Sequence, residues 1–153
     1  MLNTLVGQTR RSRTIAAGQQ AIWEVLADFG ALSTWAGNVD HSCLLRAGSE
    51  PVGRTRRVQV GRLVLIERIV EFAPSCALAY DIEGLPAFAG AVRNRWELHP
   101  RSERSTEVTL TTTVDIGSRM PQRIAEQVIG RATAKLSDGL LTGLATHLEA
   151  THV

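Results

Sequence analysis

The spacing of apolar residues changes twice along this chain of 153 residues. From about residue 39 to residue 114, apolar residues mostly recur at every second position, which predicts β-strands separated by glycine and proline turns. Residues 19–28 and 121–150 instead carry apolar residues at the three- and four-residue spacing of an amphipathic helix. We therefore expect a strand at 9–15, short helices at 19–28 and 31–35, six further strands, and one long closing helix.

Short turns join the six later strands, for example at Gly61-Arg62 and Pro74-Ser75. Strands joined in this way form an antiparallel sheet, and such a sheet needs one of its faces covered. The closing helix is the only expected element large enough to cover it. The fold class is therefore α+β, and a length of 153 residues fits one domain spanning residues 1–153.

The apolar stripe of the closing helix has small residues at its centre. The larger residues of the stripe are Val128, Ile129, Leu136 and Leu140, and the small ones between them are Ala125, Ala132, Gly139 and Gly143. Glycine costs about 1 kcal/mol relative to alanine inside a helix, so its presence needs a reason. We expect the helix to roof a cavity near Val128 and Ala132 and to contact the sheet closely toward Gly139 and Gly143.

Composition and charge narrow the classes of function. No apolar run approaches the roughly 20 residues of a membrane span, so we expect no span. The first residues lack the basic region and apolar core of a secretory signal, and the expected location is the cytoplasm. A net charge of +2 is too small to indicate nucleic acid as a partner.

Cysteine and histidine usage gives no sign of a metal centre or a cofactor. Cys43 and Cys76 form neither a disulfide framework nor a metal motif, and we expect both to be buried, inert thiols. The four histidines are scattered without ligand spacing, and no phosphate-binding or dinucleotide-binding glycine motif occurs. We therefore expect neither metal nor cofactor.

Three groups of residues, in the same order along the chain, resemble a known superfamily. They are Trp23-Glu24-Val25-Leu26-Ala27-Asp28-Phe29 with Trp35, then Val52-Gly53-Arg54-Thr55-Arg56 with Glu67-Arg68, then Tyr80 with Ile82. The set is similar to the START-like (SRPBCC) superfamily of polyketide cyclases and lipid-transfer proteins, over nearly the whole chain. The resemblance implies a helix-grip fold: a curved seven-stranded antiparallel sheet around the C-terminal helix, two short helices between strands 1 and 2, and a hydrophobic cavity inside.

The alternation of the strands predicts which side chains face the helix. Arg56 shares a face with Val58, whereas Arg57 faces away. A buried arginine needs a carboxylate partner or an anionic ligand, and Glu67 on the next strand is the candidate partner. The resemblance places Glu67 where abscisic-acid receptors of the superfamily have a ligand-contacting glutamate. A structural Arg56–Glu67 pair and a ligand-contacting role both remain open.

The predicted ligand-binding residues share the inward parity or roof the cavity. They are His41, Arg56, Val58, Val60, Glu67, Tyr80, Asn94, Trp96, Thr112, Val128 and Ala132. Tyr80 and Trp96 suit a cavity wall, because each has a large apolar body and one polar tip. His41, Arg56 and Tyr80 are the candidate catalytic residues, as a general base or as groups that orient and polarise a substrate.

Three classes of function remain open at this point. The first is binding of a small hydrophobic molecule, such as a lipid, polyketide or quinone-like compound, by a monomer or homodimer. The second is a polyketide cyclase or dehydratase acting in the same cavity. The third is a toxin-like member that binds ribosomes or proteins, which a basic outer face with Arg57, Arg93 and Arg95 would favour. The Gly84-Leu85-Pro86-Ala87 segment matches part of the abscisic-acid receptor gate loop but follows a different strand, so its role as a gate stays open.

Overall fold

A computed structural model describes residues 6–85, 90–115 and 122–150, with side chains throughout except at Val6, 122–130 and Ala132. Within these ranges the elements are β1 (Val6–Ile15), α1 (Gln19–Ala27), the 3-10 helix η1 (Phe29–Thr34), β2 (His41–Arg46), β3 (Thr55–Val60), β4 (Leu63–Ala73), β5 (Ala77–Glu83), β6 (Ala91–Ser102), β7 (Ser105–Asp115) and α2 (Gln122–Ala150). This succession confirms the predicted order of one strand, two short helices, six strands and a long helix. The 84–87 segment lies partly outside the described residues.

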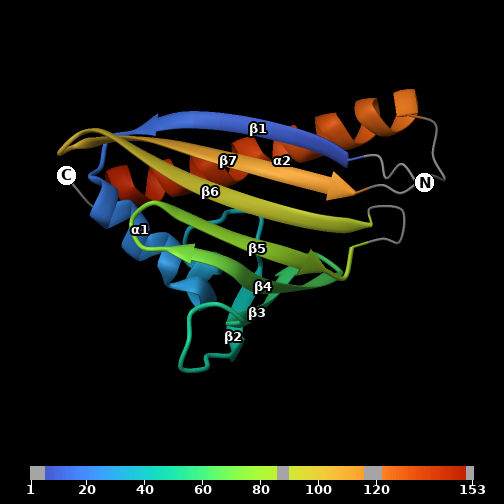
Figure 1. Ribbon diagram of the computed structural model, residues 1–153, viewed down its shortest axis with the longest axis horizontal. Helices are drawn as coiled ribbons and strands as arrows, with labels where there is room; N and C mark the ends of the chain where they lie inside the picture. The colour runs from blue at the N-terminus through green and yellow to red at the C-terminus, as the bar shows by residue number, and fades with distance from the viewer. Residues whose placement is uncertain (1–5, 86–89, 116–121, 151–153) are drawn as a thin grey trace.

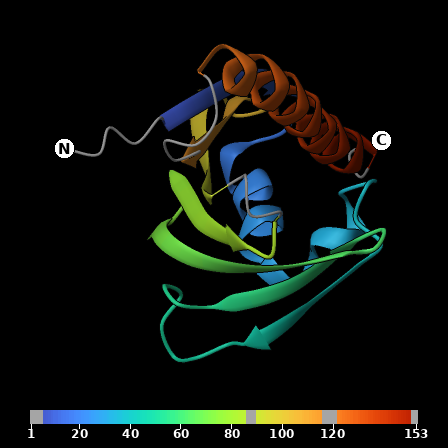
Figure 2. The same ribbon diagram turned by 90° about the vertical axis from the view of Figure 1, so that its right-hand side faces the viewer.

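The strands form one seven-stranded antiparallel sheet in the order β1-β7-β6-β5-β4-β3-β2. The sheet curves, and α2 lies across its concave side (Figures 1 and 2). The short helices α1 and η1 lie at the end of the sheet where α2 finishes (Figure 1). This arrangement is the expected helix-grip fold. In the part of the chain that the structure describes, no helix is long and apolar enough to cross a membrane.

The inward face of α2 matches the predicted stripe only in part, since Leu140 packs against the core and lines a cavity there but the buried residues lie beside it. Its buried residues are Ser137, Leu141, Leu144, Ala145 and Leu148, which recur every three or four residues. Gly139 lies two positions from Ser137, about 200° around the helix at 3.6 residues per turn. It is exposed, and a Cβ atom added there would meet nothing within 4 Å. The prediction that Gly139 faces the sheet is therefore wrong, and Leu136 is half exposed.

Gly143 does make the expected close approach, although its neighbour is not a strand. A Cβ atom at Gly143 would lie 2.5 Å from the backbone oxygen of Trp35, which follows η1. Real Cβ atoms essentially never come so close to another heavy atom. Glycine is therefore required here so that α2 can pack against the end of η1.

The parity predicted for the second strand is wrong. His41 is exposed and pairs with Gln59 on β3, while Ser42 pairs with the buried Val58 and so faces inward. The reason is a change of backbone direction before the strand begins. The amide of Val39 donates to the carbonyl of Ala36 in a turn, so the alternation does not run from Val39 through to His41.

Both cysteines are exposed, contrary to the expectation of buried thiols. Cys43 lies on the same side of β2 as His41, because its partner on β3 is Arg57. Cys76 lies in the turn between β4 and β5. The apolar residues around each cysteine in the sequence therefore did not indicate burial of the thiol.

The outer face of the sheet carries ion pairs rather than a basic surface. The Nε atom of Arg93 lies 2.6 Å from Asp81 Oδ1, and that of Arg95 lies 2.7 Å from Glu71 Oε1. Each of these arginines therefore has its charge balanced by an acidic neighbour. The sequence-based argument for a basic, ribosome-binding face loses the support of Arg93 and Arg95.

Candidate functional site

A cavity of about 380 Å³ lies between the sheet and α2. Its lining residues are Leu32, Asn38, Val39, Val58, Val60, Leu63, Leu65, Glu67, Tyr80, Ile82, Leu85, Val92, Asn94, Thr112, Val114, Thr133, Leu136, Ser137 and Leu140. Most of these side chains are apolar, as is usual in sites for small molecules. Leu63 and Leu136 line the cavity and are also 43% and 53% exposed, so they mark its mouth.

A buried ion pair lies in the wall of this cavity. Arg56 on β3 stands directly opposite Glu67 on β4, and the two side chains are only 4% and 6% exposed. Arg56 Nε donates to Glu67 Oε1 over 2.7 Å, and Arg56 Nη2 lies 2.7 Å from the same oxygen. Glu67 lines the cavity, whereas Arg56 is not among the lining residues.

Several further contacts hold Arg56 behind the wall. Its Nη1 atom donates to the backbone oxygen of Phe29 over 2.9 Å. The guanidinium also lies 3.8 Å from the centre of the Phe29 ring and 4.6 Å from that of Tyr80, within the range of cation–π attraction. The guanidinium of Arg56 therefore contacts a carboxylate, a backbone oxygen and two aromatic rings of the protein itself. These contacts support the structural interpretation of the Arg56–Glu67 pair.

A line of hydrogen-bonded polar side chains crosses the cavity wall, and we call it the polar row. It consists of Tyr80, Asn94, Thr112 and Ser137, on β5, β6, β7 and α2. Tyr80 pairs with Asn94 in the sheet, and Asn94 with Thr112, so the three side chains share one face. Asn94 Nδ2 donates to Tyr80 Oη over 3.3 Å, Thr112 Oγ1 donates to Asn94 Oδ1 over 2.6 Å, and the Thr112 and Ser137 hydroxyls are 3.5 Å apart.

The hydroxyl of Tyr80 is set up as a donor. It accepts hydrogen bonds from Asn94 Nδ2 and from Trp96 Nε1, each over 3.3 Å. In both bonds the phenol oxygen is the acceptor, so its own hydrogen has no acceptor among the described residues. Burial raises the pKa of Tyr80, and the negative charge of Glu67 raises it further. The group therefore stays protonated at neutral pH and can donate to an oxygen atom of a ligand.

The structure brings most of the predicted site residues to the cavity. Those that line it are Val58, Val60, Glu67, Tyr80, Asn94 and Thr112. Arg56 and Trp96 are buried behind the wall, where each bonds to a lining residue. His41 lies on the opposite side of the sheet and is exposed. The side chains of Val128 and Ala132 lie outside the described residues.

Sequence reasoning missed Ser137 and two leucines of β4 that line the cavity, Leu63 and Leu65. Ser137 lies four residues before the buried Leu141, and this helical spacing is the signal that could have placed it on the inward face. Leu63 and Leu65 belong to a strand that is apolar on both faces, so alternation could not assign them. Among the described residues, no group of three or more His, Cys, Asp or Glu side chains is placed to hold a metal ion.

Comparison with protein families gives a match over residues 7–149, to the family described as polyketide cyclase / dehydrase and lipid transport. No curated protein gives a significant match. A protein from Thermobifida fusca, solved by NMR in solution, is 31% identical, with 90% of each chain covered and a TM-score of 0.69.

Two further solved structures share the fold at lower identity. The Zhui aromatase/cyclase from Streptomyces sp. R1128 is 17% identical, with a TM-score of 0.79. The match covers 95% of this chain and 94% of the aromatase/cyclase chain. A START superfamily protein from Mycobacterium smegmatis is 16% identical, with a TM-score of 0.75. The match covers 94% of this chain and 98% of the M. smegmatis chain.

Proposed function

We propose that this chain, which belongs to the polyketide cyclase / dehydrase and lipid transport family, binds a small and largely apolar molecule as a single ligand-binding domain. The molecule would occupy the cavity between the sheet and α2. The observation that carries the proposal is the cavity lining, in which apolar side chains surround one polar row. Lipids, polyketides and quinones all combine an apolar body with a few oxygen atoms.

The apolar walls would supply most of the affinity. Valine and leucine side chains from β3, β4, β6, β7 and α2 surround the space, and removing apolar surface from water contributes about 25 cal/mol for each Å². A ligand that buries about 100 Å² of apolar surface would therefore gain about 2.5 kcal/mol. The polar row would then choose among apolar ligands by offering the Tyr80 hydroxyl to an oxygen atom.

The charges around the cavity favour a neutral ligand. Among the described residues that line the cavity, Glu67 is the only charged one, and Arg56 pairs with Glu67 from behind. An added anion or cation would lose its hydration and find no unpaired opposite charge in the lining. We therefore propose an uncharged ligand with at least one hydrogen-bond acceptor.

A pair of neighbouring substitutions tests this proposal. Val60 lines the cavity, while Gln59 precedes it on β3 and pairs with the exposed His41 on the outer side. Binding of 1-naphthol, an apolar ring system with one oxygen, can be measured by calorimetry. Val60→Phe fills the cavity and is expected to abolish binding, whereas Gln59→Phe is expected to leave it unchanged. Equal binding of 1-naphthol by both variants would contradict the assignment of the cavity as the binding site.

One observation also favours an enzymatic alternative, a cyclase or dehydratase. The protonated Tyr80 and the Glu67 carboxylate lie in the same wall, where a donor and an acceptor could assist proton transfer. Chromatography with mass detection of a linear polyketone after incubation separates the two functions. A carrier releases it unchanged, a cyclase releases an isomer of the same mass at a new retention time, and a dehydratase releases a product that has lost water. In either enzymatic case Tyr80→Phe would stop conversion and leave binding in place.

A further inference from the structure

The hydrogen bonds of the polar row all point in one direction. The indole N–H of Trp96 can only donate, and it donates to Tyr80 Oη over 3.3 Å. Asn94 directs Nδ2 to the same oxygen and accepts at Oδ1 from Thr112 Oγ1 over 2.6 Å. A hydroxyl group carries one hydrogen, and that of Thr112 is used in the bond to Asn94. In the 3.5 Å contact between Thr112 and Ser137, the Ser137 hydroxyl is therefore the donor.

This direction gives the polar row two chemically different ends. At the Tyr80 end the phenol oxygen accepts two bonds, and its own hydrogen is left to donate to a ligand. At the Ser137 end the hydrogen is directed to Thr112, and the oxygen lone pairs are left to accept. Tyr80 and Ser137 both line the cavity, and each is only 2% exposed. The cavity wall therefore offers one donor and one acceptor at separate, buried positions.

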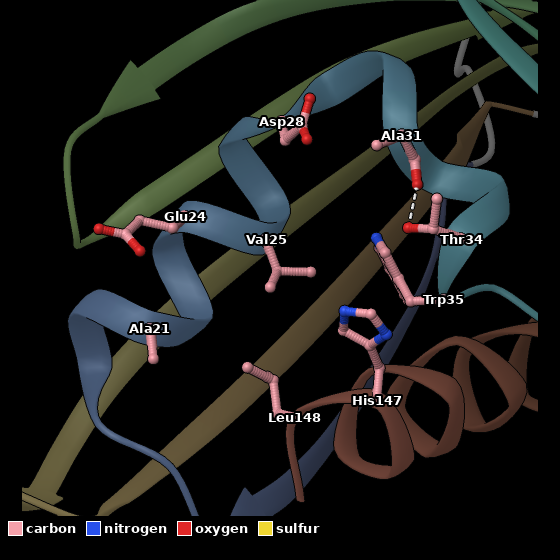
Figure 3. A pocket seen from close by; sticks show the side chains of 9 residues that line it. All are labelled: Ala21, Glu24, Val25, Asp28, Ala31, Thr34, Trp35, His147 and Leu148. Atoms are coloured by element: carbon pink, nitrogen blue, oxygen red, sulfur yellow. Dashed lines mark hydrogen bonds between the residues drawn. The ribbon is translucent and has the colours of Figure 1, made fainter. Parts of the chain in front are cut away.

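The donor end is fixed by packing behind the wall. The ring of Trp96 packs edge-on against that of Trp35, with the ring centres 5.9 Å apart and the planes at 80°. Trp35 itself lines a hollow of about 320 Å³ on the outside of the fold (Figure 3). Trp96 lines neither this hollow nor the cavity, so its N–H contributes to ligand binding only through the Tyr80 hydroxyl.

The two ends are separated by about the length of a small ring system. Tyr80 pairs with Asn94, and Asn94 with Thr112, so the row crosses directly from β5 over β6 to β7. Neighbouring strands are about 4.8 Å apart, which places the first and third of these residues roughly 10 Å apart. Ser137 extends the row from α2. Bonds that are aligned in this way polarise one another, which strengthens the bonds that a ligand forms at both ends.

We propose that the cavity selects an uncharged ligand with a carbonyl oxygen at one end and a hydroxyl group at the other, that is, a hydroxy ketone. The carbonyl accepts from the Tyr80 hydroxyl, and the ligand hydroxyl donates to Ser137 Oγ. Ser137 is thus the residue that distinguishes a hydroxylated ligand from one without the hydroxyl. This inference rests on the proposed function, because it specifies the ligand of the same cavity.

Three related naphthyl ketones test the inference by calorimetry. In 6-hydroxy-2-acetonaphthone, the carbonyl and the hydroxyl lie at opposite ends of an apolar body. In 2-acetonaphthone the hydroxyl is absent, and in 6-methoxy-2-acetonaphthone its oxygen is kept without the hydrogen. We expect the hydroxyl probe to bind about two- to tenfold more tightly than either of the others, the size of one added hydrogen bond.

Substitutions at the acceptor end locate this gain. Ser137→Ala removes the acceptor and keeps a good helix former, so it should abolish the gain and leave binding of 2-acetonaphthone unchanged. Thr146→Ala, which removes an exposed hydroxyl of the same helix outside the cavity, should preserve the gain. Thr112→Val releases the Ser137 hydrogen, which can then donate to an ether oxygen. In this variant the methoxy and hydroxyl probes should bind with similar affinity.

The outcomes separate this inference from the proposed function. If 2-acetonaphthone binds but the hydroxyl adds no affinity, or if the gain persists in Ser137→Ala, the inference is overturned and the binding cavity stands. Equal binding of the methoxy and hydroxyl probes by the unmodified protein would mean that Ser137 donates, which reverses the row and also overturns the inference. Failure of 1-naphthol and all three ketones to bind would overturn the proposed function and the inference together.

Discussion

Arg56 and Glu67 face each other across β3 and β4, and the Arg56 Nε atom donates to Glu67 Oε1 over 2.7 Å. Removing one member of such a pair leaves a buried charge without its partner. We expect Arg56→Ala to lower the free energy of unfolding by about 3–5 kcal/mol, measured by urea denaturation. Arg57→Ala, on the opposite face of the same strand, should change it by less than about 0.5 kcal/mol.

The same two variants report on ligand binding. Loss of Arg56 frees the Glu67 carboxylate in the cavity wall, so Arg56→Ala should weaken binding of 1-naphthol more than Arg57→Ala does. Equal losses in a calorimetric titration would contradict the assignment of Arg56 to the inner face and Arg57 to the outer face.

The only tyrosine of the chain gives a direct optical test of the polar row. Burial raises the pKa of Tyr80 above its ordinary value of 10.0, so the folded state keeps the phenol proton where the unfolded state has released it. The free energy of unfolding should therefore fall as the pH rises above about 10. Phenolate absorbance should appear only as the protein unfolds, whereas in denaturant it should appear near pH 10. Phenolate formation near pH 10 in the folded protein would contradict a buried Tyr80.

The polar row can be broken at one hydroxyl with little change of shape. Thr112→Val removes the donor to Asn94 Oδ1, and a lost buried hydrogen bond costs about 1–3 kcal/mol. Thr113→Val alters the next residue of β7, which faces the outer side, and should change stability by less than about 0.5 kcal/mol. Thermal unfolding of both variants measures the difference, and similar melting temperatures would argue against the hydrogen-bonded row.

The two glycines of α2 should respond in opposite directions. Gly139→Ala adds a methyl group into open space and should stabilise the protein by about 0.5–1 kcal/mol, because alanine favours the helix. Gly143→Ala places its Cβ atom 2.5 Å from the backbone oxygen of Trp35, so α2 or η1 must move and stability should fall. Urea denaturation of the two variants checks the signs. A gain at both positions would show that α2 does not pack against Trp35 as described.

The sequence was most informative where apolar and polar residues alternated regularly along a whole strand. On β3, β5, β6 and β7 the alternation predicted the inward faces, and with them Arg56, Tyr80, Asn94 and Thr112. It failed at His41, because a turn before β2 breaks the alternation that begins at Val39. Periodicity describes a segment only as long as its backbone stays regular.

The buried face of α2 was harder to predict for a different reason. In α2 the apolar residues cover more than one side, so spacing alone could not show that Ser137 and Leu141 are buried while Leu136 is half exposed at the edge of the cavity. Packing against Trp35 makes the choice, and this contact joins residues more than 100 positions apart.

The central claim is that a small apolar molecule occupies the cavity between the sheet and α2, and intermolecular NOEs from 1-naphthol to assigned methyl groups test it most directly. We predict NOEs to the methyl groups of Val58, Val92 and Val114, which line the cavity. We predict none to Val52, which is exposed outside it. NOEs confined to surface methyl groups, with none to the three cavity valines, would contradict the account.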